Sequence, residues 1–141
     1  MTKDYQLFGI GNALLDTEYQ VSEEFLTHNN VLKGRMTLID SARRSALINS
    51  VDGMPDDVSA GGSVANAIYA AQGFGCRNFF AGVVADDNIG MAFINEFTDA
   101  GIDTLPPRTT ARGDSGQCLI LLRRMGSAVL ILASVSRTRL N

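Results

Sequence analysis

A pair of glycines that leads directly into a helix of small residues constrains the fold of this chain most. Residues 60–75 read Ala-Gly-Gly-Ser-Val-Ala-Asn-Ala-Ile-Tyr-Ala-Ala-Gln-Gly-Phe-Gly. Adjacent glycines let the backbone adopt positive φ and let a ligand approach without meeting a Cβ. The first N–H groups of a helix have no partner within it and favour anionic or polar ligands. The segment therefore predicts a helix N-terminus that is open to a polar ligand.

Two polar side chains belong to this predicted helix. Ser63 stands where a residue can cap the helix, and Asn66 follows about one turn later, where its amide offers both a donor and an acceptor. Apolar residues occupy the helical spacing expected of a packed face, at Val64, Ala65, Ile68 and Ala71. A hydroxyl-rich ligand suits this arrangement, although the glycines alone also fit a loop before an ordinary packing helix.

Two further blocks combine a short strand with a polar turn. The block at 5–17 begins as a short apolar strand that runs into Gly11-Asn12. Asp16 follows four residues after Asn12. Residues 77–90 read Arg-Asn-Phe-Phe-Ala-Gly-Val-Val-Ala-Asp-Asp-Asn-Ile-Gly and are followed by a helical segment at 91–100 and by Gly-Ile-Asp at 101–103.

In order and spacing, these blocks resemble the N-terminal half of the ribokinase-like (PfkB) family of carbohydrate and nucleoside kinases. The family pattern is a strand ending in Gly-Asn or Gly-Ser with a following Asp, a G-G-x-x-x-N helix, then F-x-G-x-x-G-x-D-x-x-G, a helix and G-I/V. The resemblance covers residues 5–121, with Ala85 where the family often has Gly. Residues 34–40 and 114–119 look closer to the adenosine-kinase-like bacterial branch than to ribokinases proper.

The resemblance implies which residues hold the substrate. They are Asn12, Asp16, Gly61, Gly62, Ser63 and Asn66 in the substrate pocket, and Met36 in a lid. An ionised carboxylate accepts two vicinal hydroxyl hydrogens at once, and such charge-assisted bonds are about twice as strong as neutral ones. Asp16 is thus the principal candidate, and its alternative role is that of a turn-forming Asp after a strand.

The expected fold class is α/β, as the N-terminal part of a ribokinase-like three-layer α/β/α fold with a small β-sheet lid, and the domain is incomplete. Alternating strands and helices favour a mainly parallel sheet covered on both faces. Strands are expected at 5–11, 34–39, 58–60, 78–84 and 116–122, with an extended piece at 18–21, and helices at 22–29, 41–51, after Gly62 and at 88–100. The extended pieces near 18–21, 31–38, 58–60 and 116–122 are candidates for the lid, which would exclude water.

By the same resemblance, the phosphoryl-transfer machinery lies in the C-terminal half of the family. A Gly-Ala-Gly-Asp type motif there supplies an anion hole and the base that deprotonates the acceptor hydroxyl. No such motif follows residue 90, because residues 112–116 have its composition without its spacing or a following helix. ATP and Mg²⁺ serve the full-length family, and this chain is not expected to bind them well or to turn over by itself. No catalytic and no metal-binding residue is assigned.

The family-like part, residues 1–121, is expected to end before a tail at 122–141. Residues 122–128 read Leu-Arg-Arg-Met-Gly-Ser-Ala, where the family would continue Val-Thr-Pro-Asp-Gly-Glu-Arg. One restored base before the codons TTA CGC CGG ATG GGG AGC GC yields GTT ACG CCG GAT GGG GAG CGC, which encodes that turn. We interpret the tail as the product of a single-base frameshift. Met125 is the strictest test of this interpretation, because methionine has a single codon and that codon fits the restored frame.

Charge and composition limit the other functions. The net charge is −3 with 45% hydrophobic residues and no basic patch, so nucleic acid is not an expected partner. The start of the chain has no apolar signal core, and the run at 118–133 is interrupted by two arginines, so no membrane association and a cytoplasmic location are expected. Cys76 and Cys118 are expected to be small buried hydrophobes rather than a disulfide.

Three functions stay open. The first is the substrate half of a PfkB-type kinase whose acceptor is a sugar or nucleoside, with adenosine, inosine, ribose and fructose all possible. The second is a non-catalytic sugar- or nucleoside-binding module. The third is a dinucleotide-binding domain built on Gly9-x-Gly11, but position 14 is Leu instead of the third glycine. A sheet cut at mid-domain also predicts self-association through the lid or an exposed sheet edge.

Overall fold

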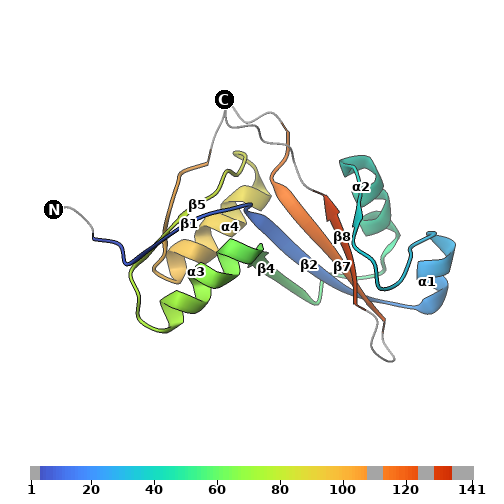
Figure 1. Cartoon of the computed structure of the whole chain (residues 1–141). Coiled ribbons are helices and arrows are strands. Elements are labelled where there is room, and N and C mark those ends of the chain that lie inside the picture. Colours follow the sequence, from blue (N-terminus) through green and yellow to red (C-terminus); the bar gives the residue numbers. More distant parts are fainter. Residues whose placement is uncertain (1–3, 108–112, 124–128, 135–141) are drawn as a thin grey trace. The chain divides into compact units, whose positions relative to one another are not determined.

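The computed structural model describes residues 4–107, 113–123 and 129–134. Figure 1 shows the elements in chain order. They are β1 (Leu7–Ile10), β2 (Leu14–Val21), α1 (Glu23–His28), β3 (Thr37–Leu38), α2 (Ser41–Ser50), β4 (Asp57–Gly61), α3 (Ser63–Gly73), β5 (Asn78–Ala81), α4 (Asn88–Asp99), β6 (Asp103–Thr104), β7 (Gly116–Arg123) and β8 (Val129–Ser134).

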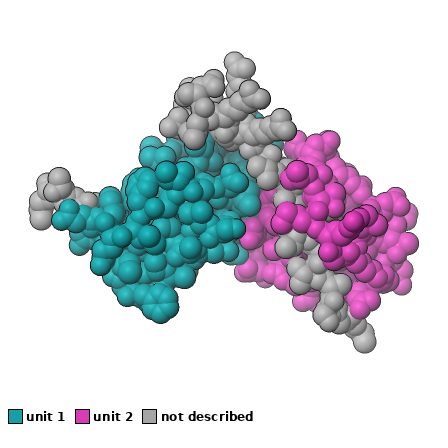
Figure 2. All heavy atoms as spheres, in the orientation of Figure 1, with its two compact units in different colours: residues 1–15, 59–116, 136–141 teal, residues 16–58, 117–135 magenta. Residues whose placement is uncertain are grey.

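The chain divides into two compact units, coloured teal and magenta in Figure 2. The first unit comprises residues 1–15, 59–116 and 136–141, and the second comprises 16–58 and 117–135. Each unit has a buried hydrophobic cluster of its own. The two units are described separately below.

The first unit is built on a three-stranded parallel sheet in the order β1-β5-β6. Helices α3 and α4 cover the face on which Phe80 lies. The Phe80 ring packs 5.5 Å from that of Phe93 and 5.2 Å from that of Phe97, and Ile68 of α3 joins the same cluster. Side chains alternate between the faces of a strand, so Phe79 lies on the opposite face, where its ring stacks on that of Phe8 at 5.2 Å.

Asp87 fastens the start of α4 to the segment before β7. Its Oδ1 accepts the N–H of Gly90 at 2.7 Å and its Oδ2 accepts the N–H of Ser115 at 2.8 Å. The Ser115 hydroxyl in turn accepts the N–H of Ala85 at 2.9 Å. A Cβ on Gly90 would lie 2.3 Å from the Ala85 carbonyl oxygen, so only glycine fits there. The Asp and Gly of the family motif therefore have a structural role in this chain.

The second unit holds most of a mixed five-stranded sheet in the order β3-β8-β7-β2-β4. β7 pairs antiparallel with β8, and β3 pairs parallel with β8. Ser22 caps α1 and Asp40 caps α2, because the side-chain oxygen of each accepts a hydrogen bond from a backbone N–H of the first helical turn. The core of this unit comprises Tyr19, Val21, Leu26, Leu47, Leu119 and Leu121.

Most of the expected elements are confirmed. The four helices begin and end within about two residues of their expected bounds, and strands occur at each expected place. The strand expected at 34–39 is wrong in extent, because only Thr37–Leu38 pairs, with β8. Two strands, β6 and β8, were not expected, and β8 lies within the tail at 122–141.

Candidate functional site

The N-terminus of α3 lacks a side-chain cap. Its N-cap residue is Gly62, with φ 107° and ψ 139°, and no side chain accepts a hydrogen bond from the first turn. The other three helices of the described chain are capped by the side chains of Ser22, Asp40 and Asp87. The expectation that Ser63 caps the helix is wrong, because Ser63 is already its first helical residue. The first backbone N–H groups of α3 are left available to a ligand.

The loop after β1 lies directly against this turn. A Cβ built on Gly62 would be 2.6 Å from the carbonyl oxygen of Asn12, so the two backbones touch. Gly11 likewise packs against Val64, where a Cβ would lie 2.7 Å from the Val64 Cβ. The structure thus brings Asn12, Gly62 and the start of α3 together within the first unit.

The other predicted residues of this unit surround the same turn in sequence. Gly61 ends β4 and is buried, whereas Ser63 and Asn66 are exposed on α3, and Asn12 is exposed in its loop. The Asn66 N–H donates to the Gly62 carbonyl at 2.8 Å, which is the first helical bond of α3. The Asn66 side chain is one turn into the helix, so its amide is presented to solvent near the helix start.

The remaining two predicted residues belong to the second unit. Asp16 is half-buried in β2, and Met36 is 67% exposed just before β3. Within this unit Asp16 lies beside Cys118 of β7, whose thiol is hydrogen-bonded to the Asp16 side chain.

Burial, which is the largest effect, raises the pKa of the Cys118 thiol from an ordinary value of 9.0 to about 11, together with the nearby charge of Asp16 and the hydrogen bond to its side chain. Cys118 is buried, as expected, and its thiol is free of a disulfide. Its contact with Asp16 was missed because it joins two strands that are about a hundred residues apart.

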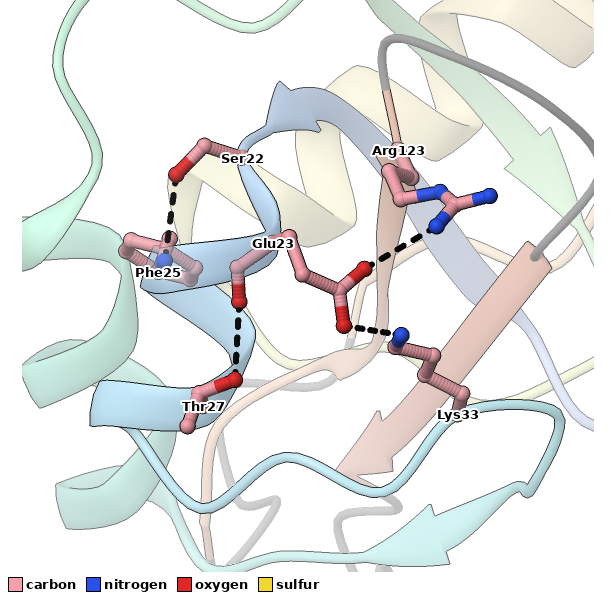
Figure 3. Close-up of polar contacts among 6 residues, drawn as sticks. All are labelled: Ser22, Glu23, Phe25, Thr27, Lys33 and Arg123. Atoms are coloured by element: carbon pink, nitrogen blue, oxygen red, sulfur yellow. Dashed lines mark hydrogen bonds and ion pairs between the residues drawn. The ribbon is translucent and has the colours of Figure 1, made fainter.

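An ion-pair cluster lies at the start of α1, as Figure 3 shows. The Glu23 carboxylate contacts the Lys33 ammonium and lies 3.1 Å from Nη1 of Arg123. Hydrogen bonds from Lys33 and Arg123 lower the pKa of Glu23. The Nε of Arg123 is buried and has no hydrogen-bond partner. The two ion pairs of Glu23 link α1 to β7 and to the loop before β3 that carries Lys33.

The dinucleotide alternative fails on local geometry. A pyrophosphate site needs a helix to begin directly after the glycine turn. Here β2 follows Gly9 and Gly11, and Gly11 serves instead to let Val64 of α3 approach.

The described residues hold neither a metal-ligand cluster nor a membrane-spanning helix. No three His, Cys, Asp or Glu side chains there are grouped as ligands of a metal ion would be. None of the helices in that part of the chain combines the length and the apolar character that a bilayer span requires. What the first unit offers chemically is hydrogen bonding, from the backbone N–H donors at the start of α3 and from the amides of Asn12 and Asn66. The second unit offers the Asp16 carboxylate.

Comparison with known proteins gives consistent similarities. The model of the pfkB family of carbohydrate kinases matches residues 36–134 and so extends past residue 121. A ribokinase from Haemophilus influenzae is 27% identical over 92 residues, which are 65% of this chain and 30% of that protein.

Solved structures agree with this match. Adenosine kinase from Sinorhizobium meliloti superimposes with a TM-score of 0.78 at 26% identity, over 93% of this chain and 39% of that one. Adenosine kinase from Trypanosoma brucei brucei superimposes with a TM-score of 0.80 at 24% identity, over 97% of this chain and 42% of that one. The present chain thus spans less than half the length of each of these proteins.

Proposed function

We propose a function from one premise: this chain belongs to the pfkB family of carbohydrate kinases. In our proposal it carries the substrate-binding half and lid of a kinase that transfers the γ-phosphoryl group of ATP to a hydroxyl of a sugar or nucleoside. Asp16 accepts two vicinal hydroxyls, and Asn12, Gly61, Gly62, Ser63 and Asn66 hold the rest of the ligand, with Met36 in the lid.

One observation carries the proposal. The N-terminus of α3 is uncapped at Gly62 and lies against the Asn12 backbone, whereas the other helices of the described chain fill the same position with a side chain. A side-chain cap there is worth about 1 kcal/mol. A ligand oxygen can take the place of that cap, and the two neighbouring asparagines give it further partners.

We further propose that this chain binds its ligand without turning it over. The proteins it resembles are more than twice as long, and its own sequence has no Gly-Ala-Gly-Asp type motif. ATP and Mg²⁺ would act with the full-length family, and we assign them no residue of this chain. Phosphoryl transfer depends on a positioned base and anion hole. We place the protein in the cytoplasm, where ATP is available.

We also propose that residues 122–141 are translated out of frame. The buried Nε of Arg123 supports this, because an unpaired buried N–H costs about 1–3 kcal/mol and the restored frame replaces Arg123 with Thr. Sequencing the coding DNA across codons 115–141 and beyond tests it. One extra base should restore Val-Thr-Pro-Asp-Gly-Glu-Arg and open a frame that leads to Gly-Ala-Gly-Asp; a confirmed frame with no kinase-like continuation overturns it.

Calorimetric titration of the chain with adenosine and with ribose tests the binding role. We expect saturable binding that Asp16→Ala and Asn66→Ala each weaken at least about tenfold, the loss expected for a hydrogen bond to a charged or well-placed group. The matched controls are Asp99→Ala and Asn95→Ala, which remove an exposed Asp and an exposed Asn from α4. Equal losses in the controls, or no binding by the wild type, contradict the proposal.

An assay for ADP formation with ATP, Mg²⁺ and each acceptor tests the inactivity. We expect no product above background from the purified chain. Product that depends on both the acceptor and Asp16 would show that the chain is catalytically competent by itself.

A further inference from the structure

Asp16 and Cys118 lie on the same face of the second sheet. In β2, Tyr19 and Val21 point into the core of the second unit, and in β7, Leu119 and Leu121 do the same. Successive side chains of a strand alternate between faces. Asp16 is an odd number of residues from Tyr19, and Cys118 is next to Leu119, so both side chains are on the face away from that core.

The two residues also lie on neighbouring strands. β2 and β7 are adjacent in the sheet order, and both residues belong to the second unit. Cys118 is 7% exposed and Asp16 is half-buried, so the thiol is largely shielded from water and the carboxylate is reachable from solvent. The thiol and the carboxylate are hydrogen-bonded to each other.

The direction of this bond is fixed by chemistry. An ionised carboxylate is an acceptor only, and a thiol is a weak donor while it stays protonated. Burial and the Asp16 charge keep the Cys118 thiol protonated well above neutral pH, because they raise its pKa to about 11. The thiol therefore donates to Asp16 at physiological pH.

We infer that Cys118 is a positioning residue for Asp16: its S–H occupies one lone pair of the carboxylate and holds the group in the orientation that receives vicinal hydroxyls. This inference rests on the proposed function. A carboxylate has about four lone-pair sites, and the thiol uses one of them. Because S–H is a weak donor, we expect Cys118→Ala to weaken binding of adenosine by about threefold to tenfold.

Thiol titration tests the contact without any ligand. In a Cys76→Ala background Cys118 is the remaining cysteine, and its thiolate is followed by ultraviolet absorbance against pH. We expect Asp16→Asn to lower the pKa of Cys118, because it removes a negative charge and a carboxylate acceptor. Asp52→Asn, which neutralises an exposed carboxylate of the same unit, is the matched control and should leave it unchanged. No difference between the two variants overturns the contact.

Ligand titration then tests the role. We expect Cys118→Ser, which keeps a donor, to restore most of the affinity that Cys118→Ala loses, with melting temperatures showing that all variants are folded. A purely structural role would make affinity follow melting temperature instead. If the wild type and Cys118→Ala bind equally well, the positioning role of Cys118 is rejected and the proposed function is retained. If the wild type binds neither adenosine nor ribose, the proposed function falls and takes this role with it.

Discussion

At the scale of single residues, Asp87 is the clearest structural carboxylate. Its burial opposes ionisation and is the largest single effect on its pKa, but the N–H bonds from Ser115 and Gly90, with smaller contributions, outweigh it and lower the pKa below 3.8. A carboxyl whose pKa is lower in the folded state stabilises the fold above its unfolded pKa and loses that effect as the pH falls through the folded pKa.

Asp87→Asn keeps a capping side chain but removes the charge. We expect the variant to be less stable at neutral pH by about 1–2 kcal/mol, because bonds to charged groups are stronger than neutral ones. The difference from the wild type should shrink as the pH falls below about 3.8, as measured by urea unfolding at several pH values. A difference that does not vary with pH would contradict the role of the ionised form.

Arg123 is expected to destabilise the fold, whereas Asp87 stabilises it. Its Nε is buried without a partner, and its ion pair is with Glu23, whose side chain is 44% exposed. Exposed pairs are worth less than about 1 kcal/mol, so the unpaired N–H dominates. We expect Arg123→Thr to raise the free energy of unfolding by about 1 kcal/mol, whereas Arg77→Thr at an exposed position should change it little. A destabilised Arg123→Thr would show that the arginine belongs in this strand.

At the scale of elements, the α3 N-terminus depends on Gly62. Its φ of 107° disfavours any Cβ, and a Cβ would lie 2.6 Å from the Asn12 carbonyl oxygen. We expect Gly62→Ala to lower the free energy of unfolding by about 2 kcal/mol or more. Gly73→Ala, at the end of the same helix with nothing within 4 Å, should be neutral or stabilising. Chemical denaturation of both variants checks this, and equal effects would contradict it.

The elements themselves were largely predictable, because they depend on local patterns. Glycine turns, helical spacing and alternating apolar residues gave all four helices and the main strands. The prediction failed where a long-range partner decides the outcome. Of 34–39 only Thr37 and Leu38 pair, with Leu132 and Ala133 of β8, and β8 itself was not predicted. The Ser63 cap failed because Gly62 already occupies the N-cap position.

At the scale of the whole molecule, the first unit presents an apolar sheet face. Phe8 is 57% and Ile10 71% exposed on β1, next to Phe79. Parallel sheets are normally covered on both faces. We expect the purified chain to self-associate with concentration in sedimentation velocity, and Phe8→Lys with Ile10→Lys to reduce this. Phe74→Lys, at an exposed residue after α3, is the control. A monodisperse wild-type monomer would contradict the prediction.

The candidate site, like the strands, was predictable only where it depends on local sequence and not where it depends on a distant partner. Asn12, Gly62 and Asn66 were identified from short motifs, and the structure brings Asn12 to the Gly62 turn. The thiol beside Asp16 was not identified, because its contact depends on the pairing of β2 with β7, which no local pattern encodes. Polar Gln117 and Cys118 at the start of an apolar strand were the one available signal.

A two-dimensional NMR titration of the ¹⁵N-labelled chain with adenosine tests whether the N-terminus of α3 binds the substrate. We expect the largest shifts on the backbone N–H groups of Ser63, Val64 and Ala65, because these are the uncapped donors of α3. The start of α4, which Asp87 already caps, should stay unchanged. Shifts confined to other parts of the chain, or no saturable shifts at all, would contradict a substrate site at this helix.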